Sequence, residues 1–320
     1  MAIFAGGLPL AALAACQLFV NSDVYQCTTD ADCTSRFPEQ TGVSCSVDRV
    51  CVVADAATDA NPPPDTGTDA GGQDADTDGP FSCANDPPPE PKPGVTVNYT
   101  RFFQDVAAGT ALLDIGIEVC ALFDVTCSAP RKEDGGIIVV PDDAGKVTVT
   151  VEYGFNGLLQ VTDLFDAGDG GPKVVTPALI QVTPPVVQPD TVGPPALMVS
   201  PSVFDSVANT VFGGGTADPT LAHVFFRTND CHQQPLKDIT VAAGTTGPKT
   251  TKVFYFDGLV PDTTFTATDA TGKGGILNLP PGTNTLTAYF PNSQVMGKVS
   301  NVQLRAGFIT YVIITPTKGN

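Results

Sequence analysis

The sequence predicts a mainly β protein, and three observations lead to this expectation. Apolar and polar residues alternate along Lys146–Glu152 (Lys-Val-Thr-Val-Thr-Val-Glu), which places three valines on one face of a strand. Many short segments of similar character follow one another, with Gly, Pro and Asp between them. Only one stretch has the pattern of a helix. Short strands at close spacing favour β-sandwiches.

The N-terminus has the features of an export signal. Residues 2–15 carry no charge and are mostly Ala, Leu, Ile and Phe, a length that fits the apolar part of a signal peptide and is too short to span a membrane. The stretch ends in Leu13-Ala14-Ala15-Cys16, which resembles the lipobox of bacterial lipoproteins. The alternative is a helix of small residues that happens to end in cysteine, since no Lys or Arg precedes Cys16.

The lipobox resemblance implies a location. Residues 1–15 would be a lipoprotein signal peptide, and Cys16 would carry the lipid that holds the protein to the membrane. Gln17 after the cysteine implies transfer to the outer membrane, at the cell surface or its periplasmic face. With Cys16 assigned to lipid, eight of the nine cysteines remain, an even number that suits an oxidising compartment.

Residues 16–53 form the first expected module, which is rich in cysteine. Its cysteines are Cys27, Cys33, Cys45 and Cys51, with gaps of five, eleven and five residues. The module is too small for a hydrophobic core, so disulfides must order it. Three pairings are open. A zinc site is the alternative, but the usual two-residue ligand gaps are absent. The segment resembles short Cys-Thr-x-Asp-x-Asp-Cys modules of bacterial surface proteins.

The other four cysteines lie further along the chain. Cys120 and Cys127 flank an expected turn after a strand, so we expect a local bridge between them. Cys83 would then pair with Cys231 and tie the end of the linker that precedes the strands to the second half of the fold.

Residues 54–93 are expected to be a disordered linker rich in Asp, Pro and Gly. Between Ala54 and Glu90 there are nine acids and no base, half of the net charge of −18. Such a segment cannot bury enough apolar surface to offset its ordering entropy, and its like charges extend it into a stalk. Asp74, Asp76 and Asp78 copy the first half of an EF-hand loop, but Pro80 and Asn85 break the remainder. They are weak calcium candidates, and a solvated linker is the favoured interpretation.

The sequence offers no reaction centre, cofactor motif or metal site. The acidic charge argues against nucleic-acid partners, which require Lys and Arg to displace counterions. Catalytic zinc needs three protein ligands, and His223 and His232 are the only histidines. We therefore expect no catalytic residues and no enzyme activity. An enzyme would require distant carboxylates such as Asp230 and Asp238 to converge in a cleft.

The strand pattern falls into two sets, 94–186 and 200–320, separated by a Pro-rich linker at 187–199. One helix is expected, with Ser200 as N-cap, Pro201 at its first position and Gly213 as its stop. The first set of expected strands is Val95–Thr100, Gly116–Ala121, Lys146–Glu152, Leu158–Thr162 and Ala178–Thr183. The second set is Ala222–Arg227, Asp238–Ala242, Lys252–Phe256, Thr263–Thr268, Gly275–Leu279, Asn284–Phe290, Val299–Arg305 and Phe308–Thr315.

Both sets contain a similar motif of turn, strand, turn and strand. Asp142-Asp143-Ala144-Gly145-Lys146 leads into one copy, and Asp269-Ala270-Thr271-Gly272-Lys273 leads into the other, which continues through Pro280-Pro281-Gly282. This pattern resembles the carboxypeptidase regulatory-like domain, a transthyretin-like β-sandwich also described as a carbohydrate-binding-like fold. The resemblance implies two such sandwiches and an accessory role without peptidase chemistry.

The expected function is therefore non-catalytic: an outer-membrane surface lipoprotein with a structural, adhesion or binding role. Its partners would be the membrane, through the lipid anchor, and surface proteins or polysaccharide. A module that binds cell-wall or surface polysaccharide is one alternative, although the chain has no Trp and six Tyr to offer as sugar platforms. An accessory subunit of a secreted hydrolase is the second alternative.

Overall fold

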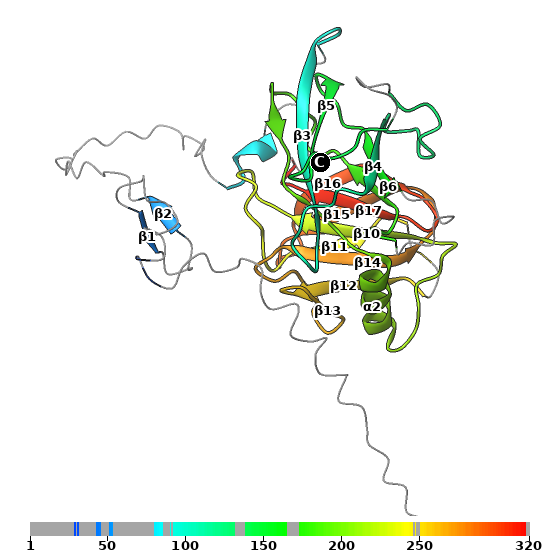
Figure 1. Ribbon diagram of the computed structural model, residues 1–320. Helices are drawn as coiled ribbons and strands as arrows, with labels where there is room; N and C mark the ends of the chain where they lie inside the picture. The colour runs from blue at the N-terminus through cyan, green and yellow to red at the C-terminus, as the bar shows by residue number, and fades with distance from the viewer. Residues whose placement is uncertain are drawn as a thin grey trace, which may run out of the picture. The chain divides into compact units, whose positions relative to one another are not determined.

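The computed structural model describes residues 29, 31, 43–45, 51–53, 80–85, 90, 92–131, 138–164, 173–245, 247 and 250–317. The chain divides into two compact units, Met1–Ala75 and Asp76–Asn320. The prediction of a mainly β protein is confirmed: strands fall into several sheets with a sandwich-like arrangement (Figure 1). In the first unit the described strands are β1 (Val43–Cys45) and β2 (Cys51–Val53), an antiparallel pair in which Cys45 lies opposite Cys51.

The second unit begins with a 3-10 turn, η1 (Ser82–Asn85), and continues almost entirely in strands. Its strands are β3 (Thr96–Asp105), β4 (Ile115–Cys120), β5 (Lys146–Glu152), β6 (Leu158–Asp163), β7 (Ala178–Gln181), β8 (Thr191–Val192), β9 (Ala196–Met198), β10 (Ala222–Thr228), β11 (Thr240–Ala243), β12 (Lys252–Asp257), β13 (Val260–Asp262), β14 (Lys273–Leu279), β15 (Gly282–Tyr289), β16 (Val295–Leu304) and β17 (Ile309–Ile314).

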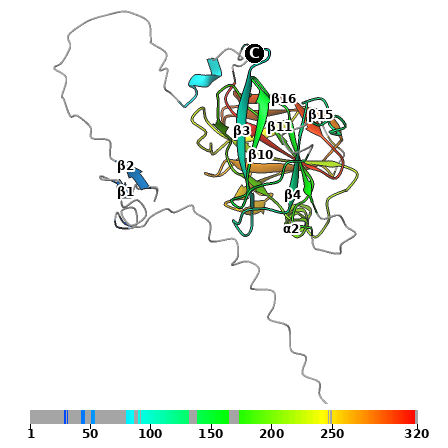
Figure 2. The ribbon, with the colours of Figure 1, turned by 45° about the horizontal axis from the view of Figure 1, so that its top comes forward.

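One long sheet runs through both sets of strands. Its order is β13-β12-β14-β10-β17-β7-β6-β4, with β17 parallel to both β10 and β7. Two smaller sheets, β5-β3-β8 and β11-β15-β16, complete the unit, and β9 also pairs with β3. In Figures 1 and 2 the strand β3 crosses the direction of β10.

The long sheet is covered on both faces, which follows from the alternation of side chains along its strands. Ile180 of β7 and its neighbour Tyr311 of β17 face the side on which β3 and β5 pack, and the first core forms there. Phe225 of β10 lies on this same side, under the helix α2 (Pro201–Phe212). Val312 of β17 faces the opposite side, where β11, β15 and β16 close the second core. The unit thus has two separate sandwich cores on opposite faces of one sheet.

The predicted helix is confirmed together with both of its ends. Ser200 is extended and its hydroxyl accepts a hydrogen bond from Val203 N at 3.4 Å, while Pro201 occupies the first turn. Gly213 ends the helix in the left-handed region (φ 63°), and Gly213 N and Gly214 N donate to the last free carbonyls. The apolar side of the helix packs on the long sheet, with Val207 and Val211 buried.

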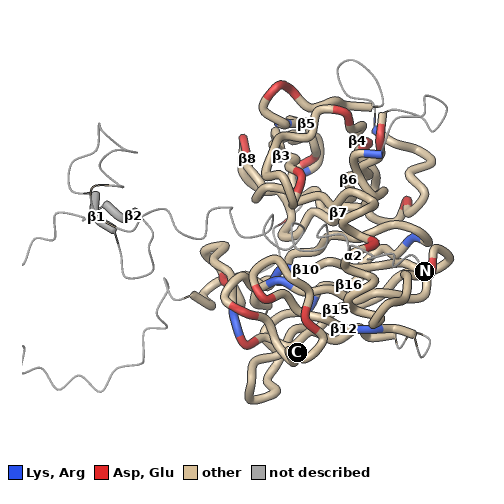
Figure 3. Tube along the Cα trace, turned by 60° about the horizontal axis from the view of Figure 1, so that its bottom comes forward, with Lys and Arg blue, Asp and Glu red and all other residues tan. Residues whose placement is uncertain are grey.

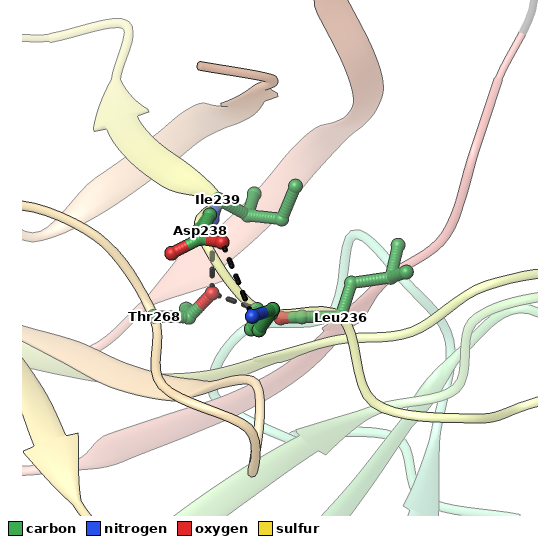
Figure 4. Close-up of polar contacts among 5 residues, drawn as sticks. Leu236, Asp238, Ile239 and Thr268 are labelled. Atoms are coloured by element: carbon green, nitrogen blue, oxygen red, sulfur yellow. Dashed lines mark hydrogen bonds and ion pairs between the residues drawn. The ribbon is translucent and has the colours of Figure 1, made fainter.

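One predicted strand, Thr263–Thr268, is wrong. The segment starts with a local turn, because Asp262 Oδ1 accepts hydrogen bonds from the Thr264 amide and hydroxyl, and such bonds compete with a sheet ladder. At its end Thr268 fastens the entry to β11: its Oγ1 donates to Leu236 O at 2.8 Å and accepts from Ile239 N at 3.0 Å (Figure 4).

Residues 187–199, expected to be a Pro-rich linker, contribute β8 and β9 to the sheet of β3. Sequence periodicity misses both strands because each has only two or three residues between prolines. The division of the chain into domains at 94–186 and 200–320 stays a prediction. The first sandwich core consists mainly of residues from 94–186, with Ala196 and Met198 of the expected linker, and the second consists of residues from 200–320. The long sheet continues through both sets.

Candidate functional site

A hollow of about 400 Å³ lies beside the ends of β4 and β5. Two short segments build it, one after β4 and one after β5. Its lining residues are Ala121, Leu122, Ala129, Arg131, Glu152, Tyr153, Gly154, Phe155, Asn156 and Gly157.

The first wall is the loop after β4, which is held by a disulfide and by one carboxylate. Cys120 and Cys127 are bridged. Inside the loop, Asp124 Oδ2 accepts a hydrogen bond from Ala129 N at 2.8 Å, and its Oδ1 accepts one from Ser128 N at 2.9 Å. These two amides lower the pKa of the Asp124 carboxyl. The loop is therefore a fixed element, and Arg131 follows it with its amide on Val119 O at 2.8 Å.

The second wall is the turn between β5 and β6. Phe155 pairs with Val186, and its ring covers Gly157 so closely that any β-carbon there would overlap the ring and the Cys120 carbonyl. Gly157 is thus needed for the two walls to meet. The turn presents the half-buried ring of Tyr153 and the exposed amide of Asn156 to the hollow.

Charges of both signs lie at the rim. Arg131 Nη2 is 3.6 Å from Glu152 Oε1, and these side chains are 34% and 70% exposed. Such a solvent-exposed ion pair contributes little to the free energy of unfolding. Because both side chains are in contact with solvent, both are accessible to a ligand. Lys92 Nζ lies 4.2 Å from the centroid of the Tyr153 ring. An aromatic ring beside an amide, a guanidinium and a carboxylate can bind a small polar molecule. The ring contacts the apolar face of the molecule, and the polar groups form hydrogen bonds with its hydroxyl groups.

The structure confirms two of the expected disulfides. Cys120 pairs with Cys127, and Cys83 pairs with Cys231 at a Cα–Cα distance of 5.5 Å. Cys45 and Cys51 are opposite one another in the β1–β2 pair. The lipidation candidate Cys16, the cysteines Cys27 and Cys33, and the calcium candidates Asp74, Asp76 and Asp78 lie outside the described residues.

The two histidines lie in different local structures: His223 is in a strand, within the expected strand Ala222–Arg227, and His232 is in a turn. His223 is buried in β10, where its Nδ1 accepts a hydrogen bond from Asn278 N at 3.3 Å and its ring lies 4.9 Å from that of Phe204. Burial lowers the pKa of His223 to about 4, although Asp218 opposes the shift. His232 is exposed in the turn after β10. Within the described part of the chain, no group of three or more His, Cys, Asp or Glu residues is placed to hold a metal ion.

The carboxylates that an enzyme would need have separate local roles. Asp230 Oδ1 accepts hydrogen bonds from His232 N and Gln234 N, both at 2.8 Å, which shape the turn. Asp238 is exposed and lies 3.8 Å from Lys237 Nζ. Neither aspartate lines the hollow described above.

The hollow was not predicted from the sequence. Its signal is Tyr153-Gly154-Phe155, because two aromatic residues flanking a glycine in an exposed turn are typical of a binding surface. Arg131 gives no such signal, because its approach to Glu152 depends on the course of the whole loop after β4.

No protein-family profile matches the sequence, and no curated protein matches it. Several solved bacterial structures do match. A streptococcal ancillary pilin is 12% identical over 70% of this chain and 63% of its own (TM-score 0.24). The TIE protein of Bacillus anthracis is 12% identical over 70% of this chain and 34% of its own (TM-score 0.19). The minor pilin GBS52 of Streptococcus agalactiae is 11% identical over 70% of this chain and 97% of its own (TM-score 0.20). The chain therefore spans less than two thirds of the first two.

Among the described residues, no helix combines the length and apolar character needed to cross a membrane.

Proposed function

We propose that this protein is a non-catalytic lipoprotein of the outer membrane that serves in surface structure or adhesion. Cys16 would carry the anchor, the acidic segment 54–93 would act as a spacer, and the β-rich unit would be the part that meets other molecules. The lipobox-like Leu13-Ala14-Ala15-Cys16 and the composition of the spacer support this proposal.

The observation that carries the proposal is the covalent attachment at the end of the spacer. Cys83 is bonded to Cys231, 148 positions later in the chain. The carbonyl of Pro80 accepts a hydrogen bond from Cys231 N at 2.9 Å, and the ring of Phe81 packs edge-on against Phe290 at 5.2 Å. Such a disulfide suits a folded unit that is tethered through its N-terminal segment. Tension on the tether is then passed to the second half of the unit through a covalent bond and not only through non-covalent packing. Two disulfides also fit a protein made for an oxidising compartment.

The experiment is membrane fractionation of the native host followed by intact-mass analysis. We expect the protein in the outer-membrane fraction, with the mass of a chain that starts at Cys16 and carries acyl groups. The Cys16→Ser variant should be found without lipid and away from that membrane. Recovery of the unmodified full-length chain from the cytosol would overturn the proposal.

Carbohydrate binding is a second candidate, favoured by the hollow beside Tyr153. Its aromatic ring, amide and charged pair match what a short saccharide needs for stacking and for hydrogen bonds. The test is a glycan array with the wild type, Tyr153→Ala and the exposed-site variant Asn156→Ala. Phe123→Ala is the matched control, since Phe123 is 71% exposed and does not line the hollow. Binding that survives both hollow variants would rule out this site.

A further inference from the structure

Two cations lie side by side on the long sheet, and neither forms an ion pair with a described residue. Arg227 of β10 and Lys273 of β14 are directly opposite one another in the antiparallel register. Directly opposed side chains on neighbouring strands have β-carbons about 5 Å apart, and like charges in this position repel. Figure 3 marks basic residues in blue, with one group next to β10. Each of the two side chains is half-buried, so water screens their repulsion only in part.

Neither cation is held in a direct ion pair by another described residue. The ion pairs in this part of the chain join Arg131 to Glu152 and Lys237 to Asp238. Arg227 Nε is buried and has no hydrogen-bond partner. Burial of an unpaired donor is costly, and such groups normally have a partner in the protein, an ordered water or a ligand.

Asp269, the acid that acts on Lys273, also accepts hydrogen bonds from its own neighbours. Asp269 Oδ1 accepts hydrogen bonds from the amide and hydroxyl of Thr271, and its Oδ2 accepts one from Gly258 N at 2.8 Å. Asp269 raises the pKa of Lys273, but burial and the charge of Arg227 together outweigh it, and the pKa of Lys273 is lowered. With one carboxylate beside two cations, the local charge stays positive, in a chain whose net charge is −18.

The surroundings give the pair an amphipathic character. Phe225 lies two residues before Arg227 and therefore on the same face of the sheet, within the aromatic cluster under α2. On the other side of Arg227, Ile313 of β17 is its register partner, and Thr183 donates a hydrogen bond to the carbonyl of Ile313 at 2.9 Å. An anion at this place would meet two cationic donors beside apolar side chains.

We infer that Arg227 and Lys273 form a binding site for an oxyanion: a carboxylate, as in an acidic sugar, or a phosphate group. The guanidinium offers a planar pair of donors and the ammonium offers a point charge, a combination that both kinds of oxyanion accept. The site lies on the long sheet, uses none of the residues of the hollow, and does not depend on the lipid anchor.

The test measures thermal unfolding and calorimetric binding of the full chain with inorganic phosphate and, separately, with galacturonate, each against chloride at equal ionic strength. We expect one of these anions to raise the melting temperature above its value in chloride. The anion that gives the larger increase identifies the source of the oxyanion. Arg227→Gln and Lys273→Gln should each weaken binding by about tenfold or more, which is the loss of one charge-assisted contact. Arg227→Lys, which keeps the charge, should retain most of the affinity.

Lys298→Gln is the matched control, because Lys298 is exposed on β16 of another sheet and its loss changes the net charge equally. In chloride alone, Arg227→Gln and Lys273→Gln should be at least as stable as the wild type, since each relieves the repulsion between the two cations. In the presence of the anion that binds, the wild type should be more stable than either variant. Equal responses of all variants, or no response beyond that to chloride, would overturn the inference. So would a loss of stability of both variants in chloride, because it would mean that the chain itself neutralises the pair.

Discussion

Cys83 and Cys231 join the start of the β-rich unit to the turn after β10, and their bond closes a loop of 148 positions that contains the whole first sandwich. The amide of Cys83 also donates to the sulfur of Cys231 at 3.0 Å, so the 3-10 turn is fixed against the second half of the unit. By contrast, Cys120 and Cys127 close a loop of only 7 positions.

We predict unequal losses of stability when the two disulfides are removed. In the chain-entropy model a disulfide stabilises by restricting the unfolded chain, and the effect grows with loop length. The double variant Cys83→Ser/Cys231→Ser should lose about 5 kcal/mol of unfolding free energy, and Cys120→Ser/Cys127→Ser about 2 kcal/mol. Urea unfolding followed by circular dichroism measures both. Equal losses would mean that strain or residual structure, rather than loop length, sets their contributions.

We predict that stability falls between about pH 6.5 and pH 4 because of His223. Its pKa in the folded protein is about 4, below the ordinary value of 6.5. In this window the unfolded chain binds a proton at His223 that the folded chain does not. The free energy of unfolding is therefore highest above pH 6.5 and decreases as the pH falls toward 4. The total decrease is about 3 kcal/mol.

Urea unfolding at several pH values, with His223→Gln for comparison, measures this contribution. The variant should show a flatter dependence above pH 4. Three aspartates have lowered pKa values: Asp124, Asp218 and Asp262. They change the free energy of unfolding only below their ordinary pKa of 3.8, so they do not contribute to the pH dependence between 6.5 and 4. An identical slope in the variant would refute the assignment to His223.

We predict that Arg101→Met stabilises the protein. Arg101 is 6% exposed in β3; its Nη1 donates to the Tyr99 hydroxyl at 2.8 Å, but its buried Nε has no partner. An apolar side chain of similar length removes a buried charge and an unpaired donor, and this outweighs the loss of the hydrogen bond to the Tyr99 hydroxyl, for an expected net gain of about 1 kcal/mol. Arg131→Met, at the exposed pair with Glu152, should change stability by less than about 1 kcal/mol. If Arg101→Met instead destabilises the fold strongly, the guanidinium has an essential partner.

We predict that Gly275→Ala destabilises the packing of the aromatic cluster under α2. A β-carbon on Gly275 would overlap the ring of Phe254 and approach the carbonyl oxygen of Val224. Overpacking of this kind costs about 1–3 kcal/mol. Gly244→Ala is the control, because its nearest neighbour would be Thr285 O at 3.4 Å. Differential scanning calorimetry should show a lower melting temperature for Gly275→Ala alone; similar values for both variants would contradict the argument.

Local features of this fold could be predicted from the sequence, and features that need a distant partner could not. The limits of β5 match the alternation of Lys146–Glu152, and α2 begins and ends at its predicted caps, because both patterns lie within the segment itself. Thr263–Thr268 was wrong because its alternation is outcompeted by the turn at Asp262. The strands β8 and β9 were missed because they exist only through pairing with β3.

The candidate sites follow the same division. The two confirmed disulfides were predicted by elimination from the number and spacing of cysteines. The hollow and the cation pair depend on register and loop course: Lys273 meets Arg227 because β14 pairs with β10 at that register, and a shift by one residue would turn one side chain to the other face.

By itself the sequence determined that this is a β-rich chain with one capped helix, an acidic segment before it and cysteines suited to disulfides, because periodicity, capping and charge are properties of neighbouring residues. Only the tertiary structure decided that the two sets of strands share one sheet and that β17 lies between β10 and β7. These pairings join segments 86 and 131 residues apart along the chain, and the burial they achieve together is not encoded in any one of them.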